Sequence, residues 1–207
     1  MKENFLCLIE LLKFEKLPAL HGDDMLKITL NRIFKDLSEA MKGYEERLSC
    51  SNFGTYILIE TKSNSDEDLS AIVNMLSAYN KQALMFGYPH KGILIRQRSI
   101  DSDYQGISVC NSKALFTSIE KLANLSTAGL VVDNDLFCEK QEFFNNCVSL
   151  FEQFPTFKIQ KAKLTDIALN GVKKSLESTF AKLGINRTDS NYNLLDSALR
   201  FIESENR

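Results

Sequence analysis

Two apolar segments carry oxygen-bearing side chains that could bind a metal ion. FLCLIELLKF, at 5–14, carries Glu10, and SNFGTYILIE, at 51–60, has Thr55 before its apolar run and Glu60 after it. Strand ends in one α/β chain are a natural place for paired metal-binding acids, because divalent cations such as Mg²⁺ prefer hard, anionic oxygen ligands. Thr55 offers only a neutral hydroxyl. The segments are therefore either a metal site with one acid missing or two ordinary core strands.

The elements that must position these side chains begin with a strand and a long helix. After the first strand, Asp23 and Asp24 can cap a helix over about 24–45. Its apolar residues recur at three- and four-residue spacing, which is typical of a helix with one buried face. Residues 47–60 then predict a β-hairpin that turns through Ser51-Asn52-Phe53-Gly54.

The next helix has clear start and stop signals. Ser65 can cap it, and its first turn holds the acids of 66–68, which are favourable near the positive end of the helix dipole. Gly87 with Pro89 is expected to end it. The acidic run is therefore explained by helix-end electrostatics rather than by a metal cluster.

A second hairpin, a helix and a strand complete the pattern. GILIRQRSI at 92–100 and GISVC at 106–110 read as paired strands, Asn111 or Ser112 begins a helix, and a buried strand ends at Asp133. The order strand, helix, hairpin, helix, hairpin, helix, strand predicts an α/β (α+β) fold. We expect a mainly antiparallel central sheet flanked by helices.

Residues 1–136 are expected to form this α/β domain, and 137–207 a mainly helical C-terminal extension packed on it. One helix of the extension should begin after Thr165 and end at Gly184. Aromatic side chains are dense at its start, and they must be covered either by the protein's own core or by a second chain. These rings are Phe137, Phe143, Phe144, Phe151, Phe154 and Phe157.

Composition excludes several classes of function. The formal net charge of the 207 residues is −2 with both signs mixed along the chain, so wholesale binding to nucleic acid is not expected. The apolar runs are too short to span a membrane. Five cysteines without a CxxC pair predict reduced, buried thiols in a cytoplasmic protein. His21 and His90 are expected in loops, where they would be solvated.

In their order, these segments resemble the class III nucleotide cyclase domain over about residues 4–136. Cyclases of this type begin with a strand that carries a metal-binding aspartate, followed by a Gly-Phe pair. CLIELLKF offers Glu10, Lys13 and Phe14 at these three positions. The second aspartate of the family sits in a hairpin written approximately Phe-Ser-Asp-Thr. Here FGTY matches that hairpin and puts Thr55 at the aspartate position.

A third block strengthens the resemblance. GILIRQRSI is similar to the family's GILVRGGI, so Arg96 matches the arginine while Gln97 and Arg98 replace two glycines. Asn111 and Lys113 fall near the positions of a family asparagine and basic residue. The resemblance implies a palm-like cyclase fold, with nucleotide contacts from Arg96, Arg98, Asn111 and Lys113 and a metal contact from Glu10. Each residue alone also fits a simpler interpretation, such as the solvated face of an edge strand.

The substitutions change the chemistry that the resemblance implies. A cyclase uses two divalent metals to activate the ribose 3′-hydroxyl and to neutralise charge on the phosphates. Glu10 would shift a bound ion by about one ångström, and such misplacement can cost about a hundredfold in rate. Thr55 cannot replace an anionic ligand, and Glu60 lies well along the next strand. No catalytic residue is therefore assigned.

Three hypotheses follow. The first is a degenerate cyclase-like protein that binds a protein partner or a nucleotide, as a homodimer or as a heterodimer with a related protein, with a regulatory role in bacterial nucleotide signalling or defence. The second is a working cyclase with non-standard ligands, for which magnesium or manganese would be the cofactor. The third is a plain protein-interaction module. The first requires no metal cofactor.

Overall fold

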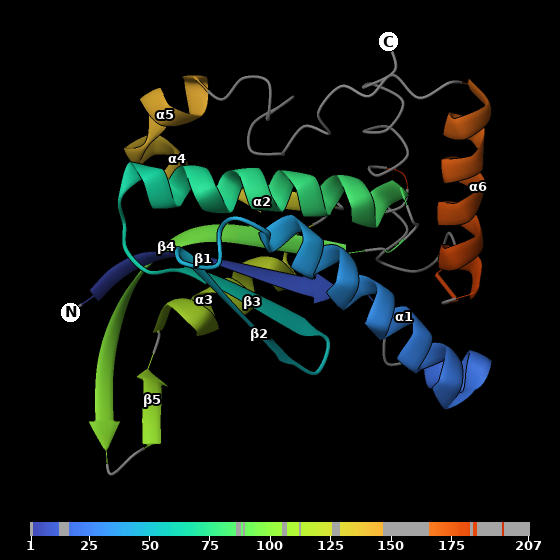
Figure 1. Cartoon of the computed structure of the whole chain (residues 1–207), viewed down its shortest axis with the longest axis horizontal. Coiled ribbons are helices and arrows are strands. Elements are labelled where there is room, and N and C mark those ends of the chain that lie inside the picture. Colours follow the sequence, from blue (N-terminus) through green and yellow to red (C-terminus); the bar gives the residue numbers. More distant parts are fainter. Residues whose placement is uncertain are drawn as a thin grey trace.

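A β-sheet lies at the centre of the molecule and carries most residues of the predicted site (Figure 1). The computed structural model describes residues 2–12, 17–85, 88, 90–104, 107–111, 113–125, 129–146, 166–182, 184–185 and 196. The strands are β1 Lys2–Leu11, β2 Leu48–Phe53, β3 Tyr56–Thr61, β4 His90–Tyr104, β5 Ile107–Asn111 and β6 Gly129–Val132. The helices are α1 Leu17–Met41, α2 Asp66–Met85, α3 Lys113–Ala123, α4 Asn134–Glu139, α5 Gln141–Asn146 and α6 Asp166–Lys182.

The strand order confirms the mainly antiparallel sheet. The strands β2, β3, β1 and β4 lie side by side in that order, and each neighbouring pair is antiparallel. The long strand β4 then serves two further partners. Its first residues pair in parallel with β6, and its last residues pair with β5 in a hairpin. The predicted sequence of elements is therefore confirmed through β6.

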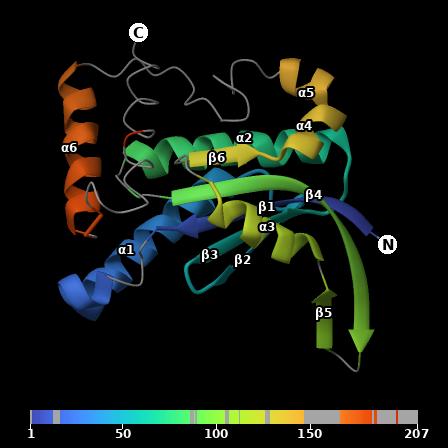
Figure 2. The same cartoon turned by 180° about the vertical axis from the view of Figure 1, so that it is seen from behind.

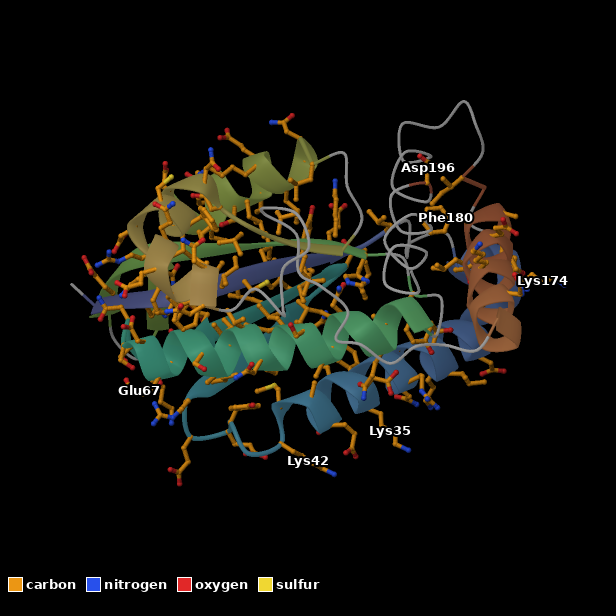
Figure 3. All side chains as sticks on the ribbon, turned by 90° about the horizontal axis from the view of Figure 1, so that it is seen from above. Lys35, Lys42, Glu67, Lys174, Phe180 and Asp196 are labelled. Carbon is orange, nitrogen blue, oxygen red and sulfur yellow. The ribbon has the colours of Figure 1, made fainter. Side chains whose placement is uncertain are left out.

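Alternating side chains of the sheet build two core layers. Phe5, Cys7 and Ile9 of β1 are buried in the layer that contains residues of α1, α2, α4 and α5. Leu6 and Leu8 are buried in the layer that contains residues of α3, because successive side chains of a strand point to opposite faces. Figures 1 and 2 show these faces from opposite sides. In Figure 3, Lys35 of α1 and Lys42, the residue that follows α1, point away from the sheet.

The first helix differs from its predicted bounds of about 24–45. It begins at Leu17 and ends at Met41, so Asp23 and Asp24 lie inside it and do not cap it. A loop was expected between the first strand and Asp23, because Pro18 and Gly22 lie there. Proline is tolerated in the first turn of a helix, where a backbone N–H would have no helical acceptor anyway, and here it lies in that turn.

The hairpin and the cap of α2 are confirmed. Gly54 and Thr55 form the turn between β2 and β3, and Gly54 has a φ of 62°, a conformation that glycine adopts without strain. The Asp68 backbone N–H donates to Ser65 Oγ at 3.2 Å, the bond expected of a helix cap. Burial raises the pKa of the Asp68 carboxyl, but hydrogen bonds from Ser63 and Arg47 outweigh this effect and hold that pKa below its usual value.

Strand β4 is longer than predicted at both ends. It starts at His90 rather than Gly92, and it extends to Tyr104 rather than Ile100. His90 is consequently fully buried, so the prediction of a solvated loop histidine is wrong. The run YPHKG suggested a turn because of its proline and glycine. Gly92, the first residue of the predicted strand, lies two residues inside the observed strand, where an added Cβ would stand 2.6 Å from Leu130 Cδ2.

The aromatic start of the C-terminal region packs against the larger core layer of the sheet. Phe144 is buried in the larger core layer, and Phe137 and Phe143 pack against that layer. The Phe137 and Phe144 rings stack with centroids 5.6 Å apart, and Phe143 meets Phe144 edge to face. These three rings therefore complete the protein's own core. The other three predicted rings, Phe151, Phe154 and Phe157, lie outside the described residues.

Helix α6 ends as predicted. Gly184 adopts a φ of 68°, its N–H donates to the Ala181 carbonyl, and the Ile185 N–H donates to the Phe180 carbonyl. This is the paired bonding of a Schellman motif. Whether 137–207 is an extension of a domain formed by 1–136 stays a prediction.

The expectation of buried cysteines is right for one described residue and wrong for two. Cys7 is fully buried in the larger core layer. Cys50 and Cys138 are exposed, and all three are free thiols. An apolar neighbourhood in the sequence misled the prediction for Cys50, because β2 lies at the edge of the sheet. The side chains of Cys110 and Cys147 lie outside the description.

Candidate functional site: a glutamate paired with a buried lysine

The fold brings Glu10 and Thr55 together. Glu10 lies opposite Tyr56 in the pairing of β1 with β3, and Thr55 is the turn residue before Tyr56. The Leu11 N–H donates to the Thr55 carbonyl at 2.9 Å, which fixes the two chain segments side by side. The two residues that the resemblance puts at the family's aspartate positions therefore lie close together, as a shared metal site would require. Thr55 lies at the turn itself rather than within the strand.

A lysine that is not among the predicted site residues occupies the position beside Glu10. Lys91 lies opposite Glu10 in the pairing of β1 with β4, and its Nζ is 3.3 Å from Glu10 Oε2. The lysine side chain is only 8% exposed, whereas the Glu10 side chain is 26% exposed. A buried ammonium group needs a counter-charge, and the Glu10 carboxylate supplies it. Glu10 is thus neutralised from within the chain.

Tyr56 of the hairpin borders Glu10 on the other side, and Phe53 packs on Tyr56 from β2. The Phe53 and Tyr56 rings stack with centroids 5.7 Å apart. Burial, with the nearby Glu10 carboxylate, raises the pKa of the Tyr56 hydroxyl. Tyr56 therefore stays neutral at physiological pH and cannot act as an anionic metal ligand.

Glu60 is too far along the sheet to replace the missing acid. It lies opposite Leu6 of β1, whereas Tyr56, the neighbour of Thr55, lies opposite Glu10. Four strand residues separate these positions, or roughly 13 Å at the usual rise per residue. Glu60 Oε1 also accepts a 2.7 Å hydrogen bond from the Gln97 side chain.

The residues around Glu10 do not fit a two-metal centre. Of the two positions that hold metal-binding aspartates in the family, only that of Glu10 carries a carboxylate here, and Lys91 already pairs with it. Thr55 contributes a neutral side chain, which Mg²⁺ accepts poorly in place of a carboxylate. Within the described ranges, no group of three or more histidine, cysteine, aspartate or glutamate side chains could hold a metal ion.

Arg96 lies on the other face of the sheet from Glu10. Its guanidinium pairs with Glu3 of β1 and with Glu139 of α4, in the layer of α2 and α4. Glu10 and Lys91 instead share the face of Leu8 and Ile93, where α3 packs. The structure therefore does not bring Arg96 to Glu10.

The backbone places the three remaining predicted nucleotide contacts near the β4–β5 hairpin. Arg98 lies opposite Glu3 in β4, Asn111 ends β5 opposite Ile100, and Lys113 is the first residue of α3. Their side chains lie outside the description. Nucleotide binding by these residues stays a prediction.

A second buried polar group lies on the opposite face, at the start of β4. His90 Nδ1 is 2.9 Å from the Tyr88 carbonyl oxygen, and Nε2 is 2.9 Å from the Asn80 side-chain amide. Burial lowers the pKa of His90 to about 4, although the hydrogen bond with Tyr88 opposes this shift. The ring is thus neutral at pH 7. Nδ1–H then donates to the carbonyl, and Nε2 accepts from the Asn80 amide nitrogen, with oxygen and nitrogen assigned from this network.

Lys91 could have been suspected from the sequence only weakly. The segment KGILI places a lysine directly before an apolar strand. Its pairing with Glu10 depends on the register between two strands that are distant in sequence, and no local pattern specifies that register.

None of the helices in the part of the chain that the structure describes is both long and apolar enough to cross a membrane.

Comparison with solved structures identifies the fold. No protein-family model matches the chain, and no curated protein matches it either. The dimeric guanylyl cyclase domain of the RhoGC fusion protein from the aquatic fungus Blastocladiella emersonii is 9% identical, with a TM-score of 0.53 over 69% of this chain and 85% of that one.

Two bacterial adenylyl cyclases agree with it. A bacterial light-regulated adenylyl cyclase is 12% identical, with a TM-score of 0.50 over 68% of this chain and 80% of that one. The adenylyl cyclase CyaB from P. aeruginosa is 11% identical, with a TM-score of 0.50 over 68% and 81%. At these identities the likeness shows the fold and no activity. The chain has the fold of class III adenylyl and guanylyl cyclase domains.

Proposed function

We propose that this protein is a catalytically degenerate cyclase-fold protein that acts by binding a protein partner. The observation that carries the proposal is the ion pair between Glu10 and Lys91, next to the uncharged Thr55. A cyclase needs two acids that share metal ions at this point. Here one acid is absent and the other is paired with a lysine.

Charge arithmetic supports the loss of activity. Two bridging acids offer two negative charges to two divalent metals, and the metals in turn stabilise the transition state. Glu10 with Lys91 and Thr55 offers a net charge of about zero. A divalent cation would have to displace the Lys91 ammonium, which would then be buried without a counter-charge, a cost of several kcal/mol.

A nucleotide-binding role is the alternative form of this proposal. Arg96, Arg98, Asn111 and Lys113 would contact the nucleotide according to the family resemblance. Arg96 would first have to release Glu3 and Glu139, which occupy its guanidinium. This cost favours the protein partner. The partner would be a second copy or a related cyclase in the cytoplasm, with a regulatory role in bacterial nucleotide signalling or defence.

The decisive experiment is a cyclase assay with the four common nucleoside triphosphates and either Mg²⁺ or Mn²⁺. We expect neither pyrophosphate release nor a cyclic product. Turnover that Glu10→Ala abolishes would overturn the proposal and support a working cyclase with non-standard ligands. Glu142→Ala is the matched control, because Glu142 is an exposed carboxylate on α5.

Calorimetric titration with the same nucleotides distinguishes the two binding roles. No heat of binding at millimolar nucleotide is expected if a protein is the partner. Binding without turnover, weakened by Arg98→Ala, would replace the protein partner by a nucleotide.

A further inference from the structure

The edge strand β2 lacks the features that normally keep a sheet edge from pairing with another chain. It pairs with β3 on one side, and the described chain contributes no strand to its other side. All residues from Ser49 to Phe53 are exposed. Natural edge strands are usually protected by charges, prolines, bulges or a covering element. The segment SCSNF contains neither a charge nor a proline, and its pairing with β3 runs without a bulge.

The hydrogen-bond pattern shows which backbone groups face outward. The Lys62 N–H donates to the Arg47 carbonyl at 2.9 Å, so this opposing pair bonds across the hairpin. Bonded and non-bonded pairs alternate in an antiparallel ladder. Ser49, Ser51 and Phe53 therefore direct their backbone groups to β3. The N–H and C=O groups of Cys50 and Asn52 point away from the sheet.

We propose that β2 pairs antiparallel with β2 of a second copy, with the two-fold axis at Ser51. This register places Cys50 opposite Asn52 of the second copy on both sides of the axis, so all of their outward backbone groups gain partners. Because residues 49–53 carry no charge, two copies of β2 can pair without bringing like charges together. That is why a second copy fits better than a charged peptide.

This pairing would join the two central sheets into one continuous sheet. A two-fold axis uses the same patch twice and closes the assembly, so no fibre forms. Strand pairing alone buries less than the roughly 800 Å² per partner of a standard interface, so we expect a dimer with micromolar affinity. The proposal deepens the proposed function, because it makes the second copy the protein partner and β2 the contact. It does not depend on the state of Glu10 or on nucleotide binding.

Cysteine cross-linking tests the register. In a background that removes both exposed thiols, Cys50→Ser with Cys138→Ser, Ser51→Cys puts two thiols directly across the axis. The Cα atoms of a non-bonded pair are about 4.5 Å apart, so a disulfide can form there. Ser49→Cys is the matched control, since it is also exposed on β2 and faces the same side. It would lie opposite Phe53 of the second copy, far from its own mate.

We expect a covalent dimer from Ser51→Cys under mild oxidation and none from Ser49→Cys. Sedimentation velocity of the unmodified protein should show a dimer that Ser51→Lys dissociates, because two lysines would meet at the axis. A monomeric mass throughout the micromolar range, or equal cross-linking of both cysteine variants, would overturn the proposal. Either result would leave the cyclase assay unaffected.

Discussion

At the residue scale, Glu10 and Lys91 form a unit whose energy can be measured. Removing the Glu10 carboxylate leaves the Lys91 ammonium group without a counter-charge, although the lysine side chain is only 8% exposed. Removing both charges leaves no unpaired charge in a layer that already contains Leu8 and Ile93. Buried ion pairs behave asymmetrically for this reason: breaking one costs more than replacing it.

We therefore predict that Glu10→Gln lowers the free energy of unfolding by about 1 to 3 kcal/mol, and that Glu10→Gln with Lys91→Met restores most of this loss. Urea unfolding of the wild type, the single variants and the double variant gives the coupling energy. Additive effects of the two substitutions on the free energy of unfolding would show that Glu10 and Lys91 are not energetically coupled, and would contradict this prediction.

His90 makes the stability depend on pH in a defined window. Its pKa in the folded chain is about 4, below the value of about 6.5 for an unfolded histidine. The unfolded state therefore binds more protons at mildly acidic pH. The contribution of His90 to stability is complete above about pH 6.5 and is lost as the pH falls towards 4, at up to about 1.4 kcal/mol per pH unit.

Urea unfolding between pH 4 and 7 tests this expectation. The wild type should lose about 3 kcal/mol more than His90→Gln over that window, as an order of magnitude. Carboxylates that titrate in the same range affect both proteins and cancel in the difference. Proton NMR offers a second measurement, because the His90 ring should stay neutral down to about pH 4. Ring protonation near pH 6.5 would contradict the burial argument.

At the element scale, the sequence predicts the order of strands and helices well. Periodic apolar residues, the Ser65 cap and the turn at Gly54 are local signals, and each holds in the structure. The errors fall where local signals compete. Pro18 and Gly22 suggested a loop but lie in α1, and the proline and glycine of YPHKG concealed the start of β4.

The candidate site could be predicted only in part, for a different reason. The proximity of Glu10 and Thr55 followed from a family pattern. The pairing of Glu10 with Lys91, and the separation of Glu10 from Arg96, depend on register and on the face to which each side chain points. A shift of one residue in the pairing would move every side chain of a strand to the other face. Such information resides in the assembled sheet rather than in any single segment.

At the scale of the whole molecule, the aromatic cluster ties the beginning of the C-terminal region to the sheet. Phe144 is 2% exposed and belongs to the same core layer as Phe5, Ile9 and the buried face of α2. A ring in this position is removed from water only when α5, the sheet and α2 are folded together. The region around α5 should therefore unfold with the sheet and not before it.

We predict that Phe144→Ala lowers the free energy of unfolding by about 3 to 5 kcal/mol, the usual cost of truncating a buried phenylalanine. Phe116→Ala is the matched control. Phe116 is 69% exposed on α3, so its loss should change stability by less than about 0.5 kcal/mol. Urea unfolding followed by circular dichroism and by tyrosine fluorescence should give coincident transitions for both variants, since one core holds both regions. An early, separate transition in wild-type protein, or equal effects of the two substitutions, would instead place α5 on a unit that folds independently of the sheet.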